Sequence, residues 1–131
     1  MKKIKAIIVD DEEGARDVLE NLLLRFCTEV EIIAKCENVL KAVEIINQEQ
    51  PDLVFLDIEM PNYSGFEIAT FFKKINFKII FVTAYDQYAI KAFKVSAIDY
   101  LLKPVDIEHL KNAVSRAVQQ LNIEQQSQQL S

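Results

Sequence analysis

The chain has 131 residues, a formal net charge of −5 and 50% hydrophobic residues, which fits one globular domain with its own core. An acidic chain without a cluster of Lys and Arg is a poor nucleic-acid binder by itself, because such binding needs cations that neutralise phosphates. No apolar run is long enough to cross a membrane and no signal peptide is evident, so we expect a cytoplasmic protein that contacts neither membrane nor nucleic acid.

Short apolar runs alternate with longer helical patterns in the first half of the chain. The first apolar run ends at once in the acidic residues Asp10 and Asp11, and Pro51 breaks the last helical pattern of this half. The predicted elements are a strand at 6–9, a helix at 15–26, a less apolar strand at 31–36 that suits a sheet edge, and a helix at 39–46 with Asn38 as its cap.

The same alternation continues to the end of the chain. The predicted elements are strands at 53–56, 78–82 and 99–102, a loop at 61–65, a short helix at 66–74, a helix at 87–95 and an amphipathic helix at 107–121. The tail is rich in Gln and lacks a continuous apolar face. We therefore assign 1–121 to one domain, and 122–131 to a helix extension or to a linker that leads to an effector domain absent from this chain.

Five strands and five helices in alternation predict the α/β class. Such alternation implies a doubly wound, five-stranded parallel sheet, with helices on both faces and right-handed crossovers.

Polar residues of related chemistry follow the predicted strands at their carboxyl ends. They are Asp10 and Asp11 after the first strand, Asp57 after the third, Thr83 after the fourth and Lys103 after the fifth. Ligands of open parallel sheets bind at this edge. Contact with solvent would explain any one of these residues, but five of types that handle a metal and a phosphate favour a binding site.

The three carboxylates favour a divalent cation. Asp10, Asp11 and Asp57 would repel one another if brought together, and a bound cation removes that conflict. Carboxylates and water are hard oxygen ligands, which suit Mg²⁺, or Mn²⁺, rather than zinc. The only histidine, His109, lies on the predicted last helix, where a surface position is the simpler interpretation.

With a metal bound, Asp57 can attack phosphorus as a nucleophile. The metal and Lys103 would neutralise charge on the phosphoryl oxygens, and Thr83 can donate its hydroxyl to one of them. Pro104 follows Lys103 and is a candidate for a cis peptide bond. The product would be an acyl phosphate, whose charge can reorganise nearby loops.

These segments resemble the receiver domain of bacterial two-component response regulators. The resemblance runs from about residue 3 to 121, and its combination of motifs is highly specific. The matching segments are 7–12 (IIVDDE), 56–61 (LDIEMP) with Gly65, 81–84 (FVTA) and 99–104 (DYLLKP).

The resemblance implies a flavodoxin-like (CheY-like) fold with strand order 2-1-3-4-5. It implies that Asp57 accepts a phosphoryl group from a sensor histidine kinase, and that the domain is a switch rather than a turnover enzyme. The metal ligands it implies are Asp10, Asp11, Asp57 and the backbone carbonyl of Glu59. The other roles it implies are phosphate contacts by Lys103 and Thr83, and a switch pair formed by Thr83 and Tyr100.

Residues 83–89 (TAYDQYA) and 99–104 look like the LytR/AlgR subfamily. Its members usually carry a C-terminal DNA-binding LytTR domain, so the resemblance implies transcription regulation by a longer parent protein. Ser96 departs from the family pattern, which often has Gly there. Glu59 places a further acid beside the metal site.

We expect phosphorylation to reshape the face made by the fourth helix, the fifth strand and the fifth helix. Tyr88, Ala92 and Phe93 are predicted to help build this face, although core packing is the alternative interpretation of all three and an equally good one for Phe93. The face is predicted to form a homodimer or to dock a partner.

Three other functions fit parts of the pattern. A phosphatase of the haloacid dehalogenase type needs Asp two residues after the nucleophile, where this chain has Glu59. A flavin or nucleotide carrier on the same fold is disfavoured because the chain has two glycines and no phosphate-binding loop. A phosphorylation-independent interaction module on the same fold stays open as the alternative.

Overall fold

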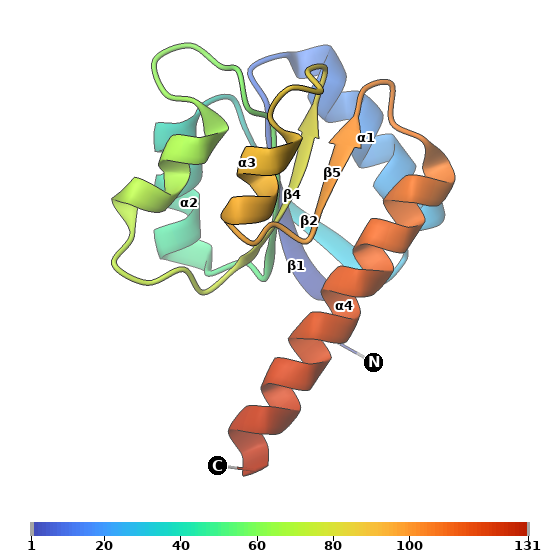
Figure 1. Ribbon diagram of the computed structural model, residues 1–131. Coiled ribbons are helices and arrows are strands. Elements are labelled where there is room, and N and C mark those ends of the chain that lie inside the picture. The colour runs from blue at the N-terminus through green and yellow to red at the C-terminus, as the bar shows by residue number, and fades with distance from the viewer. Residues whose placement is uncertain (1, 131) are drawn as a thin grey trace.

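A single parallel sheet of five strands forms the centre of the molecule (Figure 1). The computed structural model describes residues 2–130, with side chains to residue 128. The elements in chain order are β1 (Ile4–Val9), α1 (Glu13–Phe26), β2 (Val30–Cys36), α2 (Val39–Glu49), β3 (Leu53–Leu56), the 3₁₀ helix η1 (Gly65–Phe71), β4 (Lys78–Thr83), α3 (Ala89–Lys94), β5 (Asp99–Leu102) and α4 (Ile107–Leu130).

The predicted fold class and strand order are confirmed. The strands are parallel in the order β2-β1-β3-β4-β5, and each lies where an apolar run predicted it. β2 is an edge strand, as its weaker apolar character indicated. Asn38 caps α2, because its side-chain oxygen accepts a hydrogen bond of 2.8 Å from the backbone N–H of Lys41.

The third predicted helix is shorter and tighter than expected. The prediction was a helix at 66–74, whereas the structure has a 3₁₀ helix over Gly65–Phe71. The helix ends because Phe72 turns to an extended conformation, and its ring packs edge-on against Phe77 with 5.4 Å between the ring centroids. The half-buried Phe72 thus packs on the buried Phe77 instead of continuing the helix toward Lys74.

Helices cover both faces of the sheet, as Figure 1 shows. On one face α1 and α4 pack through Leu19, Leu23, Leu110 and Val114. On the other face α2, η1 and α3 pack against the remaining side of the strands, with Phe81 in this core. Because both faces are covered, β3 is buried along its whole length, which explains its continuous apolar sequence.

The strand order reverses between β1 and β3, and this is the point where open α/β sheets bind ligands. Backbone hydrogen bonds continue past the strand ends at this edge. The N–H of Asp57 donates to the carbonyl of Val9 at 2.9 Å, and the N–H of Lys103 donates to the carbonyl of Thr83 at 2.8 Å. The polar residues that follow the strands are thereby held on a rigid frame.

Helix α4 continues past the predicted domain boundary at residue 121 and extends beyond the sheet (Figure 1). Glu124 on this extension forms an ion pair with Lys78 at the start of β4. The segment 122–131 is thus helical as far as Leu130, while its role as a linker stays a prediction. Among the described helices, none is long and apolar enough to cross a membrane.

Candidate functional site

Three carboxylates meet at the carboxyl edge of the sheet. Asp10 and Asp11 follow β1 and Asp57 follows β3, and one oxygen from each lies within 4.8 Å of the others. Asp10 is only 4% exposed and Asp57 7%, whereas Asp11 is exposed. Like charges this close in a partly buried place repel strongly, so the cluster needs a cation.

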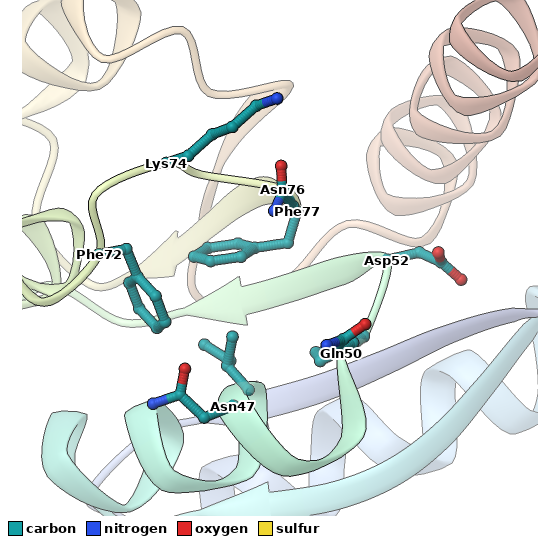
Figure 2. Close-up of a pocket in the computed structure, with 9 residues that line it drawn as sticks. Asn47, Gln50, Asp52, Phe72, Lys74, Asn76 and Phe77 are labelled. Carbon is teal, nitrogen blue, oxygen red and sulfur yellow. The ribbon is translucent and has the colours of Figure 1, made fainter. Parts of the chain in front are cut away.

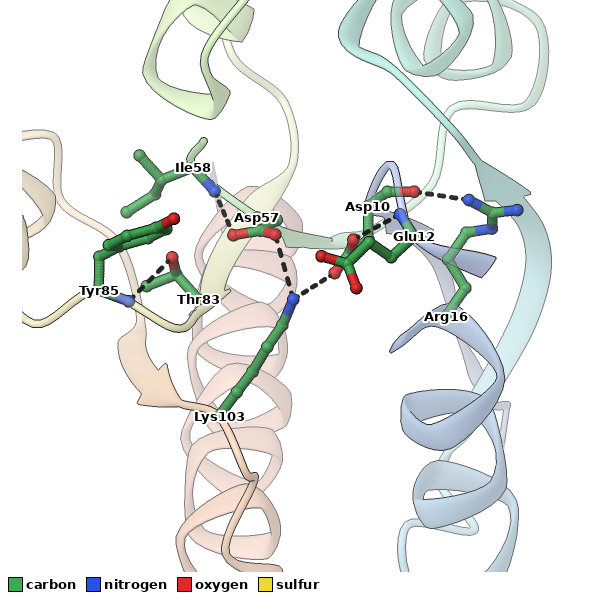
Figure 3. Close-up of polar contacts among 8 residues, drawn as sticks. All are labelled: Asp10, Glu12, Arg16, Asp57, Ile58, Thr83, Tyr85 and Lys103. Carbon is green, nitrogen blue, oxygen red and sulfur yellow. Dashed lines mark hydrogen bonds and ion pairs between the residues drawn. The ribbon is translucent and has the colours of Figure 1, made fainter. Parts of the chain in front are cut away.

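Lys103 supplies one cation from the end of β5. Its Nζ atom donates to Asp10 Oδ2 at 2.7 Å and to Asp57 Oδ2 at 3.1 Å (Figure 3). The following Lys103–Pro104 peptide bond is cis in the structure. The other Asp57 oxygen accepts the backbone N–H of Ile58 at 2.7 Å, so both oxygens of this carboxylate are directed.

Asp57 is nevertheless held in an environment that favours its neutral form. Burial raises the pKa of the Asp57 carboxyl above its ordinary value, the Lys103 ammonium opposes this, and the charge of Asp10 adds to it. Burial alone would lower the pKa of Lys103, but its bonds to Asp10 and Asp57 outweigh burial and raise that pKa. Lys103 is therefore firmly charged, and it compensates the acidic cluster only in part.

The donor set fits a hard divalent cation. Asp10, Asp11 and Asp57 offer three carboxylate oxygens within 4.8 Å of one another, and the single ammonium of Lys103 cannot balance three negative charges. Oxygen-only ligands of this kind suit Mg²⁺ or Mn²⁺. Glu59 lies in the loop after β3 with an exposed side chain, and its predicted backbone contact to the metal stays a prediction.

Thr83 and Tyr100 are linked through one residue of the loop after β4. The Thr83 side chain is fully buried, and its Oγ1 accepts the backbone N–H of Tyr85 at 3.4 Å (Figure 3). The hydroxyl of Tyr100 on β5 donates to the carbonyl of Tyr85. The two residues predicted to form a switch pair thus bond to the same residue, Thr83 to the backbone N–H of Tyr85 and Tyr100 to its carbonyl.

The roles of Gly65 and Arg16 at this site were not predicted. Gly65 N–H donates to the carbonyl of Ile58 at 2.8 Å, and a Cβ atom at this position would lie 2.2 Å from the backbone oxygen of Asp57. Arg16 donates through Nη1 to the backbone carbonyl of Asp10 at 2.7 Å. The available signals were a Gly eight residues after Asp57 and an Arg five residues after Asp11.

The family model for the response regulator receiver domain matches residues 6–115 of this chain. The chain belongs to the response regulator receiver domain family.

Curated relatives indicate the subfamily of this receiver domain. The sensory transduction protein LytT of Bacillus cereus is 48% identical over 115 residues, which are 86% of this chain and 46% of that relative. The transcriptional regulatory protein BtsR of Salmonella typhi is 42% identical over 118 residues, which are 89% of this chain and 49% of BtsR. The chain therefore spans about half the length of these relatives, and it is consistent with a LytTR-type regulator.

Solved receiver domains have the same fold. The response regulatory domain of mrkE from Klebsiella pneumoniae is 29% identical with a TM-score of 0.79, covering 88% of this chain and 96% of that domain. The REC domain of AraT from Geobacillus stearothermophilus is 29% identical with a TM-score of 0.81, covering 93% of this chain and 98% of that domain.

The three residues predicted to build an interaction face differ in exposure. Phe93 on α3 is 84% exposed, so it belongs to the surface and not to the core. Tyr88 is half-buried beside Phe66, with 5.9 Å between ring centroids. Ala92 is 2% exposed and packs in the core, because it lies on the side of α3 that faces the sheet. The burial of Ala92 agrees with core packing, which was the alternative interpretation of this residue, and a role for Tyr88 and Phe93 at an interface stays a prediction.

A cavity of about 350 Å³ lies at the opposite edge of the sheet (Figure 2). Asp52, which precedes β3, lines this cavity, whereas Asp57 follows the same strand, so the cavity is separate from the acidic cluster. Phe72 and Phe77 form apolar walls, and Asn47 and Asn76 are among its polar lining residues. None of the acidic, Thr or Lys residues of the site lines this cavity.

Proposed function

We propose that this receiver domain accepts a phosphoryl group on Asp57 from the phosphohistidine of a sensor histidine kinase, and that Mg²⁺ assists. The observation that carries the proposal is the Asp57 carboxylate, nearly buried and directed by Lys103 and Ile58, beside two further carboxylates. A nucleophile next to a cation site and a lysine is the arrangement that phosphoryl transfer requires.

In the transfer, an Asp57 carboxylate oxygen forms a bond to phosphorus while the bond from phosphorus to the donor histidine nitrogen breaks. The Nζ atom of Lys103 lies 3.1 Å from Asp57 Oδ2, so its ammonium can also stabilise the negative charge on the oxygens of a phosphoryl group attached to Asp57. Asp10, Asp11 and Asp57 would hold Mg²⁺, with the Glu59 carbonyl as a further ligand. The bound ion would supply positive charge to the carboxylates and the phosphoryl group.

The response to phosphorylation would start at Thr83. Its hydroxyl would give up the hydrogen bond from the Tyr85 N–H and donate to a phosphoryl oxygen instead. Because Thr83 and Tyr100 both bond to Tyr85, this movement would be passed on to Tyr100, which would turn inward. The face that would change consists of α3, β5 and α4, which are the fourth helix, fifth strand and fifth helix of the prediction. Its exposed apolar side chains include Ile90 (73%), Phe93 (84%) and Leu102 (44%), which suit a homodimer or a docked output domain.

The relatives named LytT and BtsR support an output in transcription regulation by a longer parent protein. A cytoplasmic location is part of the proposal, because a receiver domain of this family would meet its kinase and its DNA target there. In this proposal the domain is a phosphorylated switch, without turnover of a separate substrate. DNA would be bound by another domain of the parent, since the receiver domain is acidic.

The test is intact mass after incubation with acetyl phosphate, with and without Mg²⁺. We expect one added phosphoryl group that requires Mg²⁺, is absent from Asp57→Asn, and is retained by Asp86→Asn, a matched change at an exposed loop aspartate. A wild-type protein that gains no mass from this donor, or from a phosphorylated histidine kinase, would contradict the proposal. That result would favour the phosphorylation-independent interaction module.

A further inference from the structure

Arg16 lies outside the set of charged groups assigned to phosphoryl transfer, yet it contacts the site. It lies in the first turn of α1, half-buried, and its Nη1 atom donates to the backbone carbonyl of Asp10 at 2.7 Å (Figure 3). The bond joins a helix side chain to the peptide group between the two acidic residues that follow β1. It therefore acts on the backbone from which both carboxylates project.

Asp10 is held from every side. Its N–H donates to the Cys36 carbonyl at 3.0 Å, its Oδ1 accepts the N–H of Glu12 at 2.9 Å, and its Oδ2 accepts Lys103 at 2.7 Å. Loss of the Arg16 bond would leave these three contacts in place. Asp10 alone therefore does not need Arg16 to keep its direction.

Asp11 is in the opposite situation. Its carboxylate is exposed, and among the described residues no hydrogen bond or ion pair to it is present. Its direction therefore depends on the backbone, which means on the orientation of the Asp10–Asp11 peptide plane. Arg16 holds the carbonyl of that plane, and this carbonyl is the atom that would swing if the plane rotated.

We propose that Arg16 is a positioning residue, which directs the Asp11 carboxylate toward the cation site by holding the Asp10–Asp11 peptide plane. This inference rests on the proposed Mg²⁺ site formed by Asp10, Asp11 and Asp57. It adds a residue that acts through the backbone and touches neither the phosphoryl group nor the cation. Groups that orient metal ligands commonly change affinity by 10–100-fold when removed.

The direction in which Arg16→Ala changes the cation affinity distinguishes a positioning role from simple charge repulsion. A guanidinium near a cation site repels the cation, so removal of its charge alone would tighten cation binding. Loss of the bond to the Asp10 carbonyl would let the Asp11 carboxylate move away, which would weaken cation binding. The two explanations therefore predict opposite changes for Arg16→Ala.

The probe is Mn²⁺ alone, titrated into the full chain and followed by the electron paramagnetic resonance signal of the free ion, with Mg²⁺ competition as a second readout. We expect Arg16→Ala to weaken binding about tenfold. Arg16→Lys, which keeps a donor for the carbonyl, should recover part of the loss. Arg25→Ala is the matched control, because Arg25 lies at the far end of α1 over the ring of Phe26 and should leave affinity unchanged.

A double-mutant cycle tests the route through Asp11. If Arg16 acts through Asp11, Arg16→Ala should cost much less in an Asp11→Asn background than in the wild type. Unchanged or tighter binding by Arg16→Ala, or full additivity in the cycle, would overturn the inference. If the wild type itself binds neither Mn²⁺ nor Mg²⁺, the proposed cation site fails, and that outcome is distinct from failure of the Arg16 role alone.

Discussion

The ionised Asp57 carboxylate is expected to lower the stability of the fold, because it is nearly buried. Burial raises its pKa, the Lys103 ammonium lowers it by less than burial raises it, and the nearby charge of Asp10 raises it further. A group with a raised folded-state pKa stabilises the fold below its unfolded pKa, and this contribution is lost as pH rises through the folded pKa. At neutral pH without metal, the ionised Asp57 is therefore a cost to folding.

Asp57→Asn should stabilise the protein in the absence of Mg²⁺. Asparagine has a similar shape without charge, and Lys103 keeps its 2.7 Å bond to Asp10. We expect a melting temperature higher by roughly 4 °C, equal to about 1 kcal/mol for a domain of this size. Scanning calorimetry in EDTA measures it, and the difference should shrink when Mg²⁺ stabilises the wild type. A lower melting temperature for the variant in EDTA would show that the Asp57–Lys103 pair stabilises the fold.

Gly65 is required because a side chain would clash with the neighbouring backbone, and not because its φ angle is one that only glycine adopts easily. An added Cβ would lie 2.2 Å from the Asp57 carbonyl oxygen, so Gly65→Ala must displace the backbone of Asp57, the proposed phosphoacceptor. We expect a loss of about 1–3 kcal/mol in the free energy of unfolding, measured in urea, and slower phosphorylation by acetyl phosphate.

Gly14 provides the matched control for Gly65. It lies on α1 with nothing within 4 Å of an added Cβ, so Gly14→Ala should stabilise by about 0.5–1 kcal/mol because alanine favours the helix. Equal stability changes for the two substitutions would contradict a steric role for Gly65.

At the scale of the element, the end of α3 explains the family departure at Ser96. Ser96 has φ of 61°, its N–H donates to the Phe93 carbonyl at 3.0 Å, and the N–H of Ala97 donates to the Ala92 carbonyl at 3.2 Å. These bonds form a Schellman motif, in which glycine is the usual left-handed residue. The turn keeps its tight geometry, and Ser96 is strained instead.

Ser96→Gly should therefore raise the free energy of unfolding by about 1 kcal/mol, since a left-handed conformation costs a non-glycine residue about 1–2 kcal/mol. Urea unfolding measures the change. Asn62, with φ of 74°, is the control, because asparagine tolerates this conformation and Asn62→Gly should gain less. A destabilised Ser96→Gly protein would indicate that the serine side chain contributes a contact that outweighs its strain.

At the scale of the whole molecule, the two most exposed large apolar side chains among the described residues lie on α3, one of the elements that the proposed switch would move. Phe93 is 84% exposed and Ile90 73% exposed on a six-residue helix, and Leu102 on the adjacent strand is 44% exposed. Side chains of this size at the surface of one face are typical of a contact between proteins. The buried Ala92 beside them fixes which side of α3 faces outward.

Phe93→Glu should prevent phosphorylation-dependent dimerisation while leaving phosphorylation of Asp57 intact, because a charge at the centre of an apolar contact loses its solvation on assembly. Light scattering coupled to size exclusion, with and without acetyl phosphate and Mg²⁺, measures the mass. Leu40→Glu is the control on α2, where the side chain is 52% exposed but lies away from this face. A Phe93→Glu protein that dimerises like the wild type would exclude α3 from the interface.

The sequence by itself determined the order of elements, the strand order through its resemblance to a family, and the acids and lysine at the strand ends. These follow from local rules, since apolar runs mark buried strands and the carboxyl ends of parallel strands share one edge. Only the tertiary structure decided that Lys103 reaches Asp10 and Asp57 together, that Ala92 faces inward while Phe93 faces solvent, and that η1 ends at Phe71. It also revealed the contacts of Gly65 and Arg16. Such features depend on distances between segments far apart in the chain, which packing sets and local sequence patterns do not encode.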